Sequence, residues 1–145
     1  LAAHATDALK TAQPVKPGLT IRATQVTLTP DNRILRFARW LGLLNEPMEG
    51  RLIVAPVAHL QLGNSVSAIP LPGEPLTARG RRLRAELDAE AARVFGLTGG
   101  SFGYFVPESE WDSGRNDNYE ETLALSESTA SELFSAAGAL LRAGR

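Results

Sequence analysis

The chain has 145 residues, enough for one domain, and 43% of them are hydrophobic, so it can bury a core of its own. Its formal net charge of −1 gives no overall attraction to nucleic acid, and the lack of cysteine excludes disulfides and thiolate metal sites. No apolar run approaches the roughly 18 residues that a membrane-spanning helix needs.

Hydrophobic spacing and turn residues predict the secondary structure along the chain. Helices are expected at residues 1–12, 30–44, 74–95 and 128–144, and strands at 19–29, within 51–73 and at 94–100. The chain begins at Leu1 rather than methionine, inside a predicted helix, so we expect it to be a piece of a larger protein. The elements together predict an α/β fold, a mixed sheet with flanking helices.

Several local signals fix these elements. Asp31 or Asn32 is expected to cap the second helix. Its apolar side is predicted to consist of Ile34, Phe37, Trp40, Leu41 and Leu44. Gly63-Asn64 predicts the turn of a hairpin between two strands. In the third helix we expect an apolar stripe of Leu83, Leu87 and Ala91, and residues 101–121 are expected to form a long polar loop.

One acid, Glu74, stands in an unusual setting. It follows Pro72 and Gly73 at the end of a predicted strand and precedes Pro75 and an arginine-rich helix. Ligands bind at strand ends in α/β sheets, and the dipole of the following helix would favour the charged carboxylate. The segment therefore predicts a carboxylate held at a strand end for a function. The alternative is a turn acid that caps the helix.

Two later stretches hold further candidates. In GLTGGSFGYF, residues 96–105, glycines surround Ser101 and lead to Tyr104. They predict a backbone that approaches another surface or binds an anion, and the alternative is a mobile loop. The stretch is not a phosphate loop, since no Lys-Ser/Thr follows. Tyr119 lies in the polar stretch NDNYEE, where its phenol either enters a site or pins the loop.

The remaining polar candidates favour structural roles. His4 and His59 do not have metal-ligand spacing, and no serine has an identifiable base, so no Ser-His-Asp set is predicted. We expect His59, in an alternating strand, to be a satisfied sheet residue. The basic cluster RGRRLR, residues 79–84, shares its predicted helix with acids at 86, 88 and 90, and is expected to be a salt-bridged, solvated face.

In this order, the pieces resemble the C-terminal part of the catalytic domain of neutral and alkaline ceramidases. The matching segments are LQLGNSVSAIPLPGEPLTARGRRLR, FGLTGGSFGYFVPESEW and NYEE, followed by the closing helix. The resemblance extends from about Val15 to the end and is strongest from Leu60 to Glu120. It implies that residues 1–145 form a single domain or subdomain, a fragment of a larger α/β zinc-hydrolase domain that cleaves the N-acyl amide bond of a sphingolipid-like substrate.

The resemblance also implies roles for individual residues. Glu74 and Tyr104 match two zinc ligands of the family, and Tyr119 matches a tyrosine beside the scissile carbonyl that stabilises the oxyanion. The family's two histidine ligands and its serine nucleophile lie further toward the N-terminus. The implied partners are therefore the N-terminal portion of the same enzyme and a lipid amide at a membrane surface. The isolated chain is expected to be inactive, and the resemblance implies a secreted or periplasmic location.

The chain departs from the family pattern at two positions. Gly99 and Ser101 stand where the family commonly has asparagine and tyrosine. Two alternatives therefore remain open. The first is a non-catalytic relative that binds a lipid or glycan, and the second is a small interaction module that binds an acidic partner through RGRRLR.

Overall fold

The computed structural model of the protein describes residues 2–43, 48–49, 51–87 and 89–143, and its main layer is a five-stranded sheet. The strands are β1 (Leu19–Leu28), β2 (Met48–Glu49), β3 (Leu52–Leu62), β4 (Val66–Pro70) and β6 (Ala91–Phe95). The order is β1-β3-β4-β6, with β2 paired to β3. β3 is antiparallel to β1 and β4, whereas β4 and β6 are parallel. The predicted mixed sheet is confirmed.

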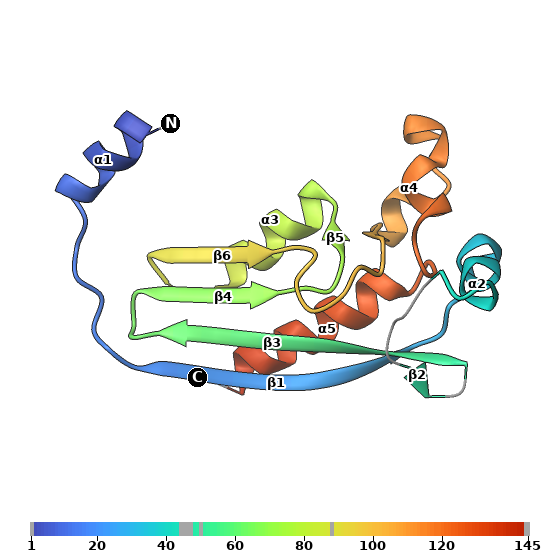
Figure 1. Ribbon diagram of the computed structural model, residues 1–145, viewed down its shortest axis with the longest axis horizontal. Coiled ribbons are helices and arrows are strands. Elements are labelled where there is room, and N and C mark those ends of the chain that lie inside the picture. The colour runs from blue at the N-terminus through green and yellow to red at the C-terminus, as the bar shows by residue number, and fades with distance from the viewer. Residues whose placement is uncertain (1, 44–47, 50, 88, 144–145) are drawn as a thin grey trace.

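Two helices cover one face of this sheet (Figure 1). α5 (Thr129–Arg142) packs against β1 and β3, and α3 (Thr77–Glu86) packs against β6 and α5. The strands supply alternate side chains to the layer between them. The fully buried members of this core include Ala55, Val57, Ile69, Leu83, Leu133 and Ala137. The inward-facing side chains of the strands and the apolar sides of α3 and α5 therefore pack into one core, as the predicted α/β fold requires.

The opposite face of the sheet carries apolar side chains in contact with solvent. Leu19, Ile21, Leu62 and Phe95 are 63, 57, 42 and 51% exposed. Within the described residues, both long helices that pack on the sheet lie on the other side (Figure 1). Apolar side chains are thus exposed along this face of the sheet, whereas large contiguous apolar patches are uncommon on the surfaces of monomeric proteins.

Smaller elements lie at the ends and edges of the sheet. They are α1 (Ala2–Lys10), α2 (Arg33–Trp40), β5 (Glu74–Pro75), β7 (Tyr104–Phe105), η1 (Glu108–Glu110), η2 (Arg115–Asn118) and α4 (Tyr119–Thr122). α1 buries none of its residues and extends away from the sheet (Figure 1). None of the helices in the described ranges is long and apolar enough to cross a bilayer.

Several sequence predictions are confirmed. The strand at 19–29 is β1, and β3 and β4 form the hairpin, with Gly63 at φ +57° in its turn. Asn32 caps α2, because its Oδ1 accepts hydrogen bonds from the amides of Ile34 (2.9 Å) and Leu35 (3.2 Å). The closing helix is α5, which begins after Ser128.

Other predictions are wrong. Residues 74–95 are not mostly helical: α3 ends at Glu86, and Ala91 begins β6. Pairing with β4 overrides the helix propensity of this alanine-rich stretch. Residues 96–100 are not a buried strand, and residues 101–121 contain β7, η1, η2 and α4 rather than only loop.

The apolar side of α2 also differs from expectation. Ile34, Phe37, Trp40 and Leu41 are 60, 58, 78 and 50% exposed rather than buried. Leu44, predicted on the same side, lies outside the described residues. The helix instead turns Leu35 toward the core.

Candidate functional site

The candidate site lies where the two parallel strands end. After β4, residues 71–73 continue alongside the chain that leaves β6. The amide of Leu71 donates to the carbonyl of Phe95 (2.8 Å), and the amide of Leu97 donates to the carbonyl of Gly73 (2.9 Å). Glu74 follows directly, so it is held at the carboxyl edge of a parallel strand pair, where ligands of α/β sheets bind.

Glu74 and Tyr104 are register partners in a separate two-stranded parallel sheet, β5 with β7. The amide of Glu74 donates to the carbonyl of Gly103 at 2.9 Å, which fixes one backbone against the other. Glu74 is exposed and Tyr104 half-buried. The structure thus brings together two residues that are 30 positions apart in the sequence.

Two glycines make this close pairing possible. A Cβ at Gly73 would lie 2.6 Å from the carbonyl oxygen of Gly103 and 2.5 Å from the ring of Phe105. Gly103 has φ +77°, and a Cβ there would overlap the carbonyl oxygen of Leu123. The predicted close approach of the glycine segment to another surface is therefore confirmed at Gly103, and the surface is the chain that follows α4.

Tyr119 reaches the same place from α4. Its ring centroid is 6.2 Å from that of Tyr104, with the planes at 62°, an edge-to-face arrangement. The side chain is 50% exposed, so it borders the site rather than filling the core. The structure therefore brings all three predicted residues, Glu74, Tyr104 and Tyr119, to one edge of the sheet.

The segment that delivers Tyr119 has an unusual backbone. Asn116, Asp117 and Asn118 all have left-handed φ values, 50°, 53° and 55°. Asn118 holds the turn, since its Oδ1 accepts from the amide of Gly114 (2.8 Å) and its Nδ2 donates to Asp112 Oδ1 (2.9 Å). Left-handed residues other than glycine cost energy, and they concentrate at functional sites.

The electrostatics of the cluster disfavour a bare phenolate. The pKa of Tyr104 is raised above 10.0, first by the charge of Glu74, then by burial, and then by Tyr119 and Glu120. The negative charges of Glu74 and Glu120 therefore disfavour a negatively charged Tyr104 phenolate. A bound cation would instead favour the phenolate. Sequence reasoning missed Glu120 as a contributor, although it stands beside Tyr119 in the NDNYEE stretch.

The capping alternative for Glu74 is wrong. α3 begins at Thr77, its N-cap residue is Leu76, and no side chain caps it. The helix dipole acts most strongly on charges within the first turn of a helix. Glu74 lies before the first turn of α3 and so outside this region.

The donor set fits only part of a zinc site. Glu74 and Tyr104 offer two oxygen donors, but zinc in proteins takes at least three protein ligands in catalytic sites. No group of three or more His, Cys, Asp or Glu that could hold a metal occurs among the described residues. Glu74 and Tyr104 are therefore fewer donors than a catalytic zinc site needs.

The remaining candidates have structural surroundings. His59 is buried in β3, and its Nε2 shares a 2.7 Å hydrogen bond with Ser67 Oγ. Burial and the nearby charge of Arg22 lower its pKa below 6.5. His59 is thus a buried sheet residue, as predicted, but it is satisfied only at Nε2, because its buried Nδ1 has no hydrogen-bond partner among the described residues.

The salt-bridged face predicted for RGRRLR is only partly right. Arg82 and Glu86 lie 3.7 Å apart, but Glu90 lies beyond the end of α3. Asp88, the third expected acid, is outside the described residues. Arg79 instead places its guanidinium over the ring of Phe134, 5.9 Å from the centroid.

The two departures from the ceramidase pattern lie in the connection from β6 to β7. Gly99 has φ +81°, and its backbone passes near Pro56 of β3. Ser101 lines a cavity against α2.

The fold and this edge define an α/β layer with a carboxylate and a phenol in register beside a second phenol. Two similar solved structures are ceramidases. Neutral ceramidase from Pseudomonas aeruginosa matches with a TM-score of 0.65 and 15% identity, over 97% of this chain and 31% of that one. A ceramidase complexed with C2 matches with a TM-score of 0.58 and 15% identity, over 98% of this chain and 33% of that one.

The chain therefore spans about a third of the length of these ceramidases. No protein-family model and no curated protein matches it. At 15% identity the likeness establishes the fold, and fold alone does not fix an activity.

Proposed function

We propose that this chain is the C-terminal part of a zinc-dependent amidohydrolase that cleaves the N-acyl amide bond of a sphingolipid-like substrate. The observation that carries the proposal is the Glu74–Tyr104 register pair with Tyr119 beside it, in a fold shared with ceramidases. Each of the three residues comes from a different segment, and glycines allow the close approach. Side chains that are only solvated would not need glycines that bring three segments of the chain this close together.

In this proposal Glu74 and the Tyr104 hydroxyl hold the metal. Zinc supplies Lewis acidity toward the amide carbonyl when it is bound. The raised pKa of Tyr104 supports a cation site, because the surrounding negative charge disfavours ionisation of the phenol until a cation is present. Tyr119 is exposed at the edge of the cluster, where its hydroxyl would donate a hydrogen bond to the oxygen that gains charge during acyl transfer.

The rest of the site belongs to the N-terminal portion of the same enzyme. That portion would supply the nucleophile and the remaining zinc ligands, since no group of three or more His, Cys, Asp or Glu that could hold a metal occurs among the described residues. The uncovered apolar face of the sheet supports such a partner, since Leu19, Ile21 and Phe95 are all more than half exposed. Burying apolar surface stabilises a contact by roughly 25 cal/mol per Å².

The test is zinc retention by the protein together with any polypeptide that accompanies it. Glu74→Ala should lose bound zinc and amidase activity, because one of the few charged ligands is removed. Glu127→Ala is a matched control, an exposed acid outside the cluster, and should retain both. A Glu74→Ala protein that keeps its zinc and its rate would refute the assignment.

A further inference from the structure

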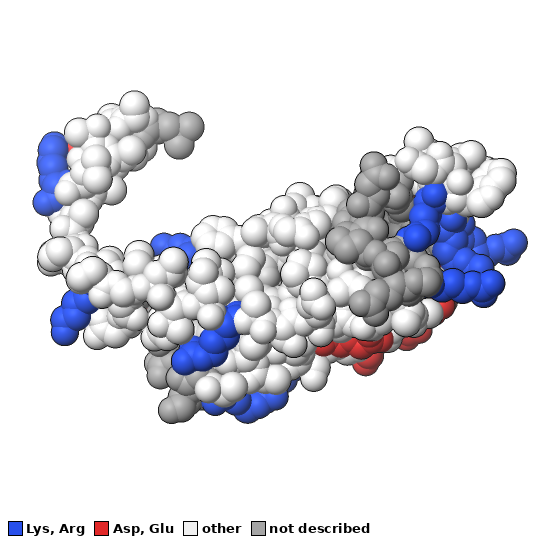
Figure 2. Space-filling model, turned by 60° about the horizontal axis from the view of Figure 1, so that its bottom comes forward, with Lys and Arg blue, Asp and Glu red and all other residues white. Residues whose placement is uncertain are grey.

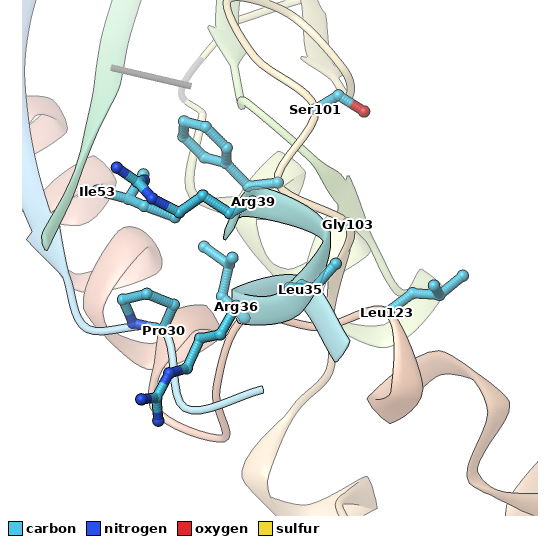
Figure 3. Close-up of a pocket in the computed structure, with 10 residues that line it drawn as sticks. Pro30, Leu35, Arg36, Arg39, Ile53, Ser101, Gly103 and Leu123 are labelled. Carbon is cyan, nitrogen blue, oxygen red and sulfur yellow. The ribbon is translucent and has the colours of Figure 1, made fainter. Parts of the chain in front are cut away.

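A separate cavity lies between α2 and the glycine segment that leads to Tyr104 (Figure 3). Its volume is about 240 Å³. Most of its wall is apolar, formed by Pro30, Leu35, Ile53, Phe102, Leu123 and Leu125. Ile53, Phe102 and Leu125 are buried core residues, so the floor of the cavity is fixed by the core itself.

Two arginines of α2 line the same cavity. Arg36 and Arg39 are one helical turn apart, and Figure 3 shows Arg36 extending on the Pro30 side and Arg39 on the Ile53 side. No Asp or Glu lines the cavity in the described part of the chain. Among the described residues, ion pairs join Lys10 to Asp7, Arg82 to Glu86 and Arg115 to Glu110, and none of these three involves Arg36 or Arg39.

The α2 end of the molecule carries a basic cluster. Figure 2 shows basic side chains gathered at this end, with a group of acidic side chains beside them. Arg33, Arg36 and Arg39 give this helix three positive charges and no acid. The charge of α2 itself therefore favours an anion over a cation at the cavity.

The apolar wall and the two arginines together suit a ligand with an apolar chain and an anionic head. An apolar cavity holds water poorly, because water needs polar partners. Guanidinium groups bind carboxylates through charge-assisted hydrogen bonds. The volume of about 240 Å³ is just below the range of drug-sized pockets, which begins at roughly 300 Å³, so it suits one chain rather than a two-chain lipid.

We propose that this cavity binds a single-chain fatty carboxylate, with its chain on the apolar floor and its carboxylate at one of the two guanidinium groups, Arg36 or Arg39. The inference rests on the proposed function, since hydrolysis of an N-acyl amide releases a fatty carboxylate. Gly103 lines the cavity and directly precedes Tyr104, so the released acid would find the cavity beside the candidate site.

Calorimetric titration with dodecanoate below its micelle concentration tests the proposal without zinc or turnover. It uses the protein together with any polypeptide that accompanies it. Wild type should bind saturably, and dodecanol, which has the same chain without the charge, should bind more weakly. The double variant R36Q/R39Q should lose about tenfold or more in affinity, because hydrogen bonds to charged groups are lost. Arg33→Gln is the matched control, a residue of α2 that does not line the cavity, and should bind as wild type does.

The outcomes separate this proposal from the function above. Saturable dodecanoate binding that depends on Arg36 and Arg39 supports it, even if the protein proves to have no amidase activity. Equal affinity in wild type and R36Q/R39Q, with both proteins folded by circular dichroism, would overturn it. Binding to anionic phosphatidylglycerol vesicles without binding to monomeric dodecanoate would also overturn it, and would assign the arginines to a membrane surface.

Discussion

Replacing Gly103 by alanine tests how the candidate site is built. Gly103 has φ +77°, in the left-handed region, where a residue with a Cβ loses about 1–2 kcal/mol. The new Cβ would also overlap the carbonyl oxygen of Leu123, a backbone atom that moves only with the chain after α4. Forced backbone movement falls among the largest mutational effects, so we expect Gly103→Ala to lower the free energy of unfolding by about 4 kcal/mol or more.

Gly114→Ala separates the two causes. Gly114 has nearly the same backbone conformation, φ +72°, but a Cβ there would meet no atom within 4 Å. This variant should lose only the conformational part, about 1–2 kcal/mol. The difference between the two variants is therefore the contribution of the close contact between β7 and the chain after α4.

Thermal unfolding followed by circular dichroism measures both losses. In a domain of this size, 1 kcal/mol corresponds to roughly 2–4 °C in Tm. Gly103→Ala should thus lower Tm by at least about 8 °C, or prevent folding, while Gly114→Ala should lower it by only a few degrees. Equal shifts in the two variants would refute the argument, because Gly103 would then have room for a side chain.

Three further predictions concern the pKa of Tyr104, the cap of α2 and the pH dependence due to His59. Glu74→Gln should lower the pKa of Tyr104, because the charge of Glu74 is the main cause of its rise; tyrosinate absorbance measures it, and an unchanged titration would contradict the pairing. Asn32→Ala should cost about 2–4 kcal/mol, since Asn32 caps α2 and its Nδ2 donates to the carbonyls of Thr122 and Ala124, both at 2.8 Å. Urea unfolding should show this loss but little change in Asp31→Ala, whose side chain is exposed. His59 has a pKa lowered below its ordinary 6.5, so its contribution to stability is present above pH 6.5 and is lost as the pH falls toward the folded pKa. Unfolding measured over that range should show less pH dependence in His59→Gln than in wild type, and identical profiles would rule out the effect.

The regular elements of the fold follow from the sequence because their signals are local. β-branched residues, a Gly-Asn turn, a helix cap and helical spacing sufficed for β1, the β3–β4 hairpin, α2 and α5. β6 was predicted only at its end, because Val94 and Phe95 fall within the strand expected at 94–100, whereas the alanine-rich residues before them favour a helix and join the strand by pairing with β4. The exposure of the apolar side of α2 could not be predicted either, because helical spacing predicts an apolar face but not whether another element covers it.

The residues of the candidate site could be predicted from the sequence, but the contact between them could not. Pro72, Gly73 and Glu74 marked a strand end, and the resemblance to ceramidases named Tyr104 and Tyr119. The physical link between them is a parallel pair of two-residue strands, which is too short to leave a periodic signal. Arg36 and Arg39 gave no sequence signal, because arginines on a helix are usually solvated. Only the tertiary structure places them at an apolar cavity.

The most direct test of the proposed amidohydrolase is turnover of a short-chain N-acyl sphingosine by the protein together with the polypeptide that accompanies it. The account predicts release of the fatty acid, loss of release after treatment with a zinc chelator, and recovery when zinc is restored. Turnover that survives complete removal of zinc would contradict the account. So would the absence of turnover in a protein that contains zinc and the N-terminal portion.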